Sequence, residues 1–215
     1  MNKGLYIVFE GQDGSGKSMQ AEKICKRLND AGHQTVQFRE PGGQLNHPHE
    51  VGEKIRQIVQ DRDNHINAMC ELALFTANRA QLMDDVKKFT EQGMHVLCDR
   101  NFLSSVVYQG YGRGLSVSLI LEITQQFGIL LPDFVALYTV ALEQSKQRLN
   151  SRSEGLDRFE AENDAFLARV QVGYHQLGEV CDRLSIPHIC LQTDDHAWDD
   201  YEKCVFEQIL VRINN

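Results

Sequence analysis

The sequence predicts an α/β fold in which a five-stranded parallel sheet carries helices on both faces. Three observations support this prediction: five short apolar segments, helical patterns between them, and polar residues that gather directly after several of the segments. Strands buried on both faces appear as short continuous apolar runs, and parallel strands need a crossover that is usually a helix. At 215 residues, with no repeat and no linker-like tract, the chain is expected to form a single domain over 1–215.

The elements can be assigned in order along the chain. The expected strands are LYIVFE (5–10), TVQFR (35–39), MHVLCD (94–99), FVALYT (134–139) and HICL (188–191). Apolar residues recur at helical spacing over 17–31, 50–61, 66–90, 116–127, 142–150, 160–184 and 197–213. Ligands of such sheets bind outside the carboxyl ends of the strands. Residues that follow positions 10, 39 and 99 are therefore the first candidates for a functional site.

Composition and charge narrow the classes of function. The net charge of −8 argues against sequence-independent binding of nucleic acid, because such binding needs a basic surface. No apolar run approaches the ~20 residues of a membrane-spanning helix. The N-terminal MNKGLYIVFEG lacks the features of a signal peptide, and the six cysteines show neither a CxxC pair nor zinc spacing. We expect a cytoplasmic protein with reduced thiols that binds neither nucleic acid nor membrane.

The segment GQDGSGKS matches the phosphate-binding pattern G-x-x-x-x-G-K-[ST] in full. It follows an expected strand and opens an expected helix, which is the context that the pattern requires. Backbone N–H groups and the helix N-terminus would face the phosphates, Lys17 would reach the β and γ phosphates, and Ser18 would bind Mg²⁺. The residues predicted to bind the nucleotide are Gly11, Gln12, Asp13, Gly14, Ser15, Gly16, Lys17 and Ser18. The loop alone predicts binding of a nucleoside triphosphate such as ATP, and no particular reaction.

The third expected strand ends in Asp99–Arg100. A carboxylate at this place organises Mg²⁺ in proteins with such loops, here with Asp99 acting through water. Arg100 favours a kinase over a hydrolase, because a kinase must hold a second anion and a guanidinium matches phosphate bidentately. A surface arginine at a strand end is the alternative interpretation if the dipeptide is taken alone.

Two further segments carry candidate binding residues. In LFTANRAQL, Phe75 and Arg79 lie four residues apart on one helical face, where a ring could stack on a base and a guanidinium could bind its edge. A core phenylalanine with a solvated arginine is the alternative that this spacing leaves open. The polar segment LNSRSEGLDRFE lies between two helices, as a closing lid would, and it supplies Arg152 and Arg158. Because Gln12–Ser15 contain no arginine, we expect a lid over about 150–160 to provide the missing cation.

Together these segments resemble the bacterial-type thymidylate kinases, which are P-loop nucleoside monophosphate kinases. The resemblance covers nearly the whole chain. Its motifs are the phosphate loop, REPGG (39–43), GEKIR (52–56), LFTANRAQL (74–82), DR…SS..YQG..RG (99–114), PD..LY (132–138) and R…LDRFE (152–160). The resemblance implies transfer of the γ-phosphate of ATP to dTMP with Mg²⁺, which gives ADP and dTDP for dTTP synthesis. It also implies a homodimer that packs through helices.

The resemblance further implies roles for individual residues. Phe75 would stack on the thymine and Arg79 would bind its edge, while Arg56 and Arg100 would hold the dTMP phosphate. The remaining residues implied in acceptor binding are Asp13 at the sugar 3′-OH, Tyr108 at the 2′ position, and Ser105 and Gln109 in the base pocket. The residues implied in catalysis are Lys17, Arg100, Arg152 and Arg158.

The sequence departs from the family pattern near the acceptor site. Gln44 replaces the usual threonine after EPGG, the 44–51 link is longer than usual, Asn101 replaces the aromatic residue often found after DR, and Met19 follows GKS. An altered or broadened acceptor, such as dUMP or a modified pyrimidine, is therefore one alternative, and a deoxynucleoside kinase is another. A non-catalytic nucleotide-sensing module is the alternative outside enzymology.

Overall fold

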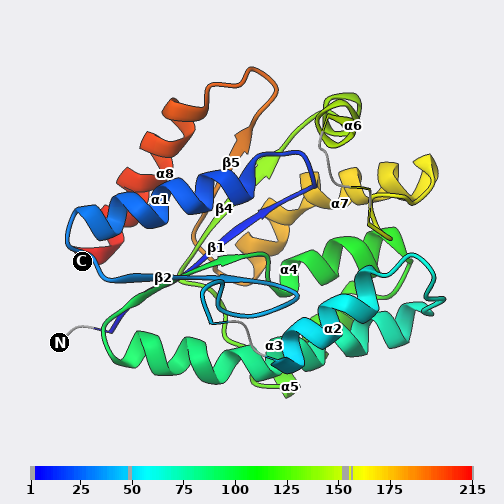
Figure 1. The fold of residues 1–215 in the computed structure, drawn as a ribbon, viewed down its shortest axis with the longest axis horizontal. Helices are drawn as coiled ribbons and strands as arrows, with labels where there is room; N and C mark the ends of the chain where they lie inside the picture. Colours follow the sequence, from blue (N-terminus) through cyan, green and yellow to red (C-terminus); the bar gives the residue numbers. More distant parts are fainter. Residues whose placement is uncertain (1–2, 48–49, 152–154, 156, 215) are drawn as a thin grey trace.

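Five parallel strands form one sheet at the centre of the molecule (Figure 1). They are β1 (Tyr6–Gly11), β2 (Thr35–Arg39), β3 (His95–Asp99), β4 (Phe134–Thr139) and β5 (His188–Gln192), in the order β2-β3-β1-β4-β5. Each strand agrees with its predicted range to within one residue at either end, so the predicted sheet is confirmed. The structure is a computed structural model, and it describes residues 3–47, 50–151, 155 and 157–214.

Helices cover both faces of this sheet (Figure 1), because successive side chains of a strand point to opposite faces. In β1, Ile7 and Phe9 pack against one face's helices, whereas Tyr6 and Val8 pack against the other's. The first face is covered by α1 (Lys17–Asp30) and α8 (Trp198–Ile213). The second is covered by α3 (Ala68–Glu91), α4 (Phe102–Ser105), the π-helical η1 (Val106–Gly112), α5 (Val117–Gln126) and α7 (Asp164–Arg183). Two outer helices complete the fold: α2 (Glu50–Gln60) packs against α3, and α6 (Leu142–Asn150) packs against α7.

The helical prediction was incomplete after β3. No helix was expected over 102–112, yet the chain forms α4 and η1 there. The start of α4 is capped by Asn101, whose Oδ1 accepts a hydrogen bond of 2.9 Å from the N–H of Leu103. The long helix expected from residue 160 begins instead at Asp164, since Asn163 caps it by accepting from the N–H of Phe166. Residues 158–160 form a turn before that cap.

The first part of the long 44–51 link lies along the edge strand β2. Gln44 pairs with Phe38 in an antiparallel bridge, and the N–H of Leu45 donates to the carbonyl of Gln37 at 3.0 Å. An exposed strand edge invites pairing with other chains, and this segment covers part of that edge. None of the helices in the described part of the chain combines the length and apolarity that a membrane span needs.

Candidate active site

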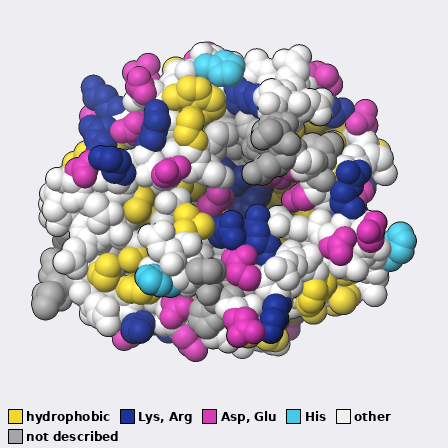
Figure 2. Space-filling model, in the orientation of Figure 1, with side chains coloured by type: hydrophobic (Ala, Val, Ile, Leu, Met, Phe, Trp, Pro, Cys, Tyr) yellow, Lys and Arg dark blue, Asp and Glu magenta, His cyan; other side chains and the backbone are white. Residues whose placement is uncertain are grey.

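A cavity of about 980 Å³ opens where β1, β2 and β3 end. This is the end of the sheet at which the sequence predicted a site. In Figure 2, basic side chains gather in the hollow at the middle of the face shown. The cations that line the cavity are Lys17, Arg39, Arg56, Arg79 and Arg100.

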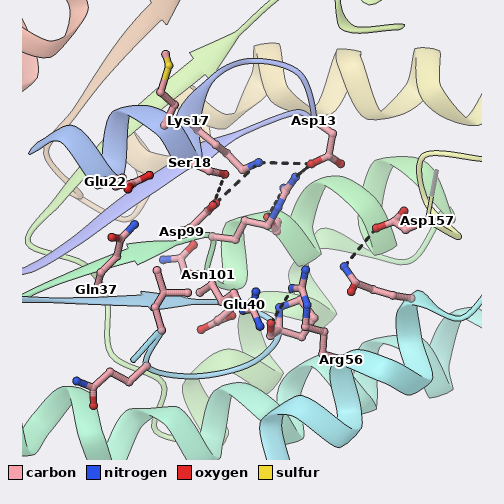
Figure 3. Close-up of a pocket in the computed structure, with 18 of the residues that line it drawn as sticks. Asp13, Lys17, Ser18, Glu22, Gln37, Glu40, Arg56, Asp99, Asn101 and Asp157 are labelled. Atoms are coloured by element: carbon pink, nitrogen blue, oxygen red, sulfur yellow. Dashed lines mark hydrogen bonds and ion pairs between the residues drawn. The ribbon is translucent and has the colours of Figure 1, made fainter. Parts of the chain in front are cut away.

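The phosphate loop connects β1 to α1 and forms one wall of this cavity. Gly14 and Gly16 have φ angles of 78° and 85°, a region that favours glycine. A Cβ atom on Gly16 would also lie 2.5 Å from the ring of Trp198, so the residue cannot be enlarged without a shift. The side chain of Lys17 is buried, and its Nζ lies 3.4 Å from Asp13 Oδ1 and 3.8 Å from Asp99 Oδ1 (Figure 3). The loop is therefore tightly formed, with its lysine directed at the cavity.

Ser18 and Asp99 bring oxygen atoms together beside Lys17. The Ser18 hydroxyl donates a hydrogen bond to Asp99 Oδ2 (Figure 3). The other carboxylate oxygen, Oδ1, is buried and accepts no hydrogen bond from the described residues. A hydroxyl and a carboxylate are the hard oxygen ligands that Mg²⁺ prefers, so these two residues fit a Mg²⁺ ion.

Asp13 projects from the phosphate loop toward the end of β3. Its Oδ1 accepts from Arg100 Nη2 at 2.6 Å, and its Oδ2 accepts from the Tyr108 hydroxyl at 3.0 Å. Burial alone would raise the pKa of Asp13, but the charges of Arg100 and Lys17 outweigh burial and hold this pKa well below its usual range. Asp13 is thus a permanent anion that links the phosphate loop to Arg100.

Arg100 is held in place from several sides. Its backbone has a φ of 74°, which is uncommon outside glycine. Nη1 donates to the hydroxyls of Ser104 at 3.1 Å and Tyr174 at 2.6 Å. The buried carboxylate of Glu10 supports the same turn, because it accepts from the N–H groups of Asn101 at 2.8 Å and Ser104 at 3.1 Å. Tyr174 and Ser104 were not predicted as site residues, since a supporting hydroxyl has no local sequence signal.

The Phe75–Arg79 pair lies in the opposite wall of the cavity. The alternative of a solvated arginine is wrong, because Arg79 is only 2% exposed. Its Nε donates to Glu40 Oε2 at 2.7 Å, and its Nη2 donates to the Asn101 carbonyl at 3.0 Å. The ring of Phe75 lies 5.8 Å from the ring of Phe159, and both rings line the same cavity as Arg79.

Comparison with known proteins identifies the family of this chain. A family model described as thymidylate kinase matches residues 9–188. Two relatives named thymidylate kinase, from Halothermothrix orenii and Chlorobaculum parvum, are each 38% identical to the chain. The alignments cover 82% and 81% of this chain and 85% and 83% of those relatives. The chain belongs to the thymidylate kinase family. A solved thymidylate kinase from Ehrlichia chaffeensis agrees in fold, with a TM-score of 0.73 at 24% identity over 97% of this chain and 99% of its own.

Of the other acceptor-site residues that the thymidylate kinase resemblance implied, some line the cavity and others lie behind its wall. Arg56 and Tyr108 line the cavity, and Arg56 Nη1 donates to the Pro41 carbonyl at 3.0 Å. Burial lowers the pKa of Arg56, and the nearby charge of Arg39 adds to this effect. Ser105 and Gln109 do not line the cavity in this structure but lie behind its wall. There Ser105 accepts from Arg79 at 3.3 Å, and Gln109 Nε2 donates to the buried Glu71 at 2.8 Å.

Of the two arginines predicted in the lid, the structure places only Arg158. Arg152 lies outside the described residues. Arg158 does not line the cavity, because its Nη2 donates to Glu71 at 2.7 Å and its Nε donates to the Val59 carbonyl at 2.7 Å. In the structure Arg158 therefore connects the lid segment to α2 and α3.

One residue that contacts the phosphate loop was not predicted. Arg148, at the end of α6, donates from Nη1 to the Gly14 carbonyl at 2.9 Å and from Nη2 to the Thr193 carbonyl at 2.6 Å. Its guanidinium lies 5.2 Å from the ring centre of Trp198. Arg148 thereby joins the phosphate loop to the segment between β5 and α8. Arg148 could not be predicted as a functional residue, because it belongs to none of the motifs and lies in an ordinary amphipathic helix.

Proposed function

We propose that this chain is an ATP-dependent dTMP kinase, which transfers the γ-phosphate of ATP to dTMP and forms ADP and dTDP. The observation that carries the proposal is that one cavity is lined by two groups of residues suited to bind anions. Lys17 and the phosphate loop form one of them, and Arg100 and Arg56 form the other. Membership of the thymidylate kinase family supports the identity of the acceptor.

On the donor side, the phosphate loop binds ATP through its backbone N–H groups and Lys17. Ser18 and Asp99 would hold Mg²⁺, with Asp99 acting through water. A Mg²⁺ ion held there would supply positive charge that offsets part of the charge of the ATP phosphates. The Ser18–Asp99 hydrogen bond supports this assignment, because it shows the two side chains already together.

On the acceptor side, Arg100 and Arg56 bind the dTMP phosphate, Phe75 stacks on the thymine, and Arg79 donates to the base edge. Asp13 accepts from the 3′-OH of the sugar while it holds Arg100. The remaining acceptor contacts in the proposal come from Tyr108, Ser105 and Gln109. For the last two, the cavity wall must adjust when dTMP binds, because both lie behind it in this structure.

The reaction needs alignment and charge stabilisation rather than a general base, because the attacking phosphate oxygen of dTMP is already ionised. Lys17 and Arg100 bring two anions together against their repulsion. Arg152 supplies a further cation when the lid over about 150–160 closes. Arg158 can add to this only if it leaves Glu71, so we assign it the secondary role.

The proposal also includes the oligomeric state of the enzyme and its place in the cell. A homodimer that packs through helices is supported by exposed apolar side chains on neighbouring helices: Val51 at 49% and Ile58 at 44% on α2, and Met69 at 49% on α3. The dimer would bury these side chains. We place the enzyme in the cytoplasm, and its ligands are dTMP and ATP.

A coupled assay of ADP release tests the acceptor. With ATP in excess, dTMP should give the highest kcat/KM among dTMP, dUMP, dCMP, AMP and thymidine. A preference for thymidine would indicate a deoxynucleoside kinase, and a preference for dUMP an altered acceptor. If no thymine or uracil deoxynucleotide were turned over, the proposed function would be wrong.

A further inference from the structure

Glu40 is a buried carboxylate in the cavity wall that the proposed reaction does not use. It follows the last residue of β2 and is only 4% exposed. Its backbone N–H donates to the Asp99 carbonyl at 2.9 Å, so its position is fixed to the end of β3. A charged side chain is rarely buried to this degree unless it is paired.

The partner of Glu40 is Arg79, which comes from α3. Glu40 Oε2 lies 2.7 Å from Arg79 Nε, and the two side chains are each 3% exposed. Arg79 Nη2 is also engaged, by the Asn101 carbonyl at 3.0 Å and the Ser105 hydroxyl at 3.3 Å. Because a guanidinium is planar, anchors on two of its nitrogen atoms fix the direction of the third. That third nitrogen, Nη1, has no hydrogen-bond acceptor among the described residues.

We propose that Glu40 is a positioning residue for base recognition, which holds the Arg79 guanidinium so that its free Nη1 faces the carbonyl at pyrimidine position 4. This inference rests on the proposed function, since it assumes that the cavity holds a pyrimidine nucleotide. Glu40 acts through Arg79 and does not touch the substrate.

The physical argument is that Arg79 cannot hold this direction alone. A buried guanidinium that loses its carboxylate is an uncompensated charge, and it turns toward whatever acceptor or water remains. A rotation would tilt Nη1 away from the base edge, even though Arg79 would still be present. The loss should then be confined to interactions with the base carbonyl.

Two substitutions distinguish the effect of the negative charge of Glu40 from the effect of its hydrogen-bond acceptor. Glu40→Gln removes the charge but keeps an oxygen that can accept from Nε. Glu40→Met removes both and preserves the length of the side chain. We expect KM for dTMP to rise about fivefold in the first variant and at least thirtyfold in the second. In both variants kcat and the KM for ATP should change less than threefold.

A modified substrate distinguishes positioning from a merely structural role. The probe is the dTMP analogue whose base is 5-methylpyrimidin-2-one, which lacks the carbonyl at position 4. The wild type should prefer dTMP to this analogue at least thirtyfold in kcat/KM, and Glu40→Met should reduce the preference to less than threefold. In an Arg79→Met background, adding Glu40→Met should cause no further loss. Glu202→Met is the matched control, because Glu202 pairs with Arg27 at 3.1 Å outside the cavity.

Several results would overturn the inference. An equal loss with dTMP and with the analogue would mean that Glu40 only supports the fold, and unchanged kinetics would mean that it supports nothing at the site. Independent losses from Glu40→Met and Arg79→Met would contradict action through Arg79. If Glu40→Met does not fold, the same comparison is made with Glu40→Gln, for which a selective loss with dTMP is required. Failure of the proposed function would differ from all of these, because the wild type itself would not turn over dTMP.

Discussion

At the scale of single residues, Asp13 shows how an acidic side chain can belong to a phosphate-binding loop. Its carboxylate does not face the anions that the loop's backbone would hold. It binds Arg100 at 2.6 Å and Tyr108 at 3.0 Å, both of which follow β3. The residue therefore ties the phosphate loop to Arg100, which the proposed function assigns to the acceptor phosphate.

Asp13→Asn should impair the use of dTMP as acceptor far more than the binding of ATP as donor. The amide keeps the shape of the side chain but removes the charge that holds Arg100. We expect kcat/KM for dTMP to fall about a hundredfold and the KM for ATP to change less than threefold, measured by steady-state kinetics. The control is Asp133→Asn, because Asp133 accepts from the Tyr6 N–H at 2.7 Å at the other end of the strands. Equal losses for both substrates would show that Asp13 only shapes the loop.

Glu40 should make stability depend on pH in the neutral range. Burial raises the pKa of Glu40 to about 7 from its ordinary 4.5, although the charge of Arg79 opposes this. The groups that face it are Arg79 from α3, Glu10 and Tyr6 from β1, and Cys98 from β3. Between these two pKa values the folded state binds more protons than the unfolded state, so the contribution of Glu40 falls as the pH rises.

The comparison with Glu40→Gln isolates this contribution, because glutamine does not titrate. The unfolding free energy of the wild type minus that of the variant should fall by roughly 3 kcal/mol between pH 4.5 and pH 7.5. Urea unfolding at several pH values measures this difference. A difference that stayed constant with pH would contradict the raised pKa.

At the scale of elements, the strands and most helices could be predicted because their signals are local. Continuous apolar runs located all five strands, and the GKS ending located the start of α1. The stretch from Phe102 to Gly112 could not be predicted, because polar residues such as Ser105 and Gln109 are buried in it together with the apolar ones, between α3 and α7. A π-helical segment of only 7 residues is too short to leave a recognisable periodicity in the sequence.

The candidate site was predictable to a similar degree. The motif residues Lys17, Ser18 and Asp99 could be found from the sequence alone. The residues that support Arg79 and Arg100 could not be found in this way. Glu40 is 39 residues from Arg79, and Tyr174 is 74 residues from Arg100. Such pairs depend on how the elements pack and leave no pattern in either segment.

Glu71 joins three elements and should be important for stability. Its carboxylate is fully buried and accepts from Gln109 on η1, from Arg113 at 3.2 Å and from Arg158 at 2.7 Å. Glu71→Ala removes the carboxylate that Arg158 binds and leaves Arg113 paired with Glu162 at 2.6 Å, and we expect the unfolding free energy to fall by about 3 kcal/mol in urea titrations. Asp30→Ala breaks the exposed pair with Lys26 and should cost less than about 0.5 kcal/mol. Equal effects of the two substitutions would contradict the role of Glu71.

The lid carries a prediction about rate. Arg152→Ala should lower kcat at least a hundredfold, because a cation would no longer reach the transferred phosphate, while the KM for ATP should stay within threefold. The measurement is steady-state turnover at saturating dTMP and ATP. Arg183→Ala, at the exposed end of α7, is the matched control. An unchanged kcat in Arg152→Ala would remove this residue from the mechanism.

At the scale of the whole molecule, the net charge and the charge of the site have opposite signs. The chain carries −8, yet the cavity at the ends of β1, β2 and β3 is lined by one lysine and four arginines. Overall acidity therefore argues against a broad basic surface but not against an anionic substrate, since a pocket needs only local positive charge. The sheet makes this possible, because three of its strands deliver their charged ends to the same place.

The most direct test of the account is to follow both products when ATP and dTMP are mixed with the enzyme. We predict that ADP and dTDP form in equal amounts and that Lys17→Met lowers both rates at least a thousandfold while the fold is retained. ADP formed without dTDP, or no dTMP-dependent product at all, would contradict the claim that one cavity joins the two phosphates.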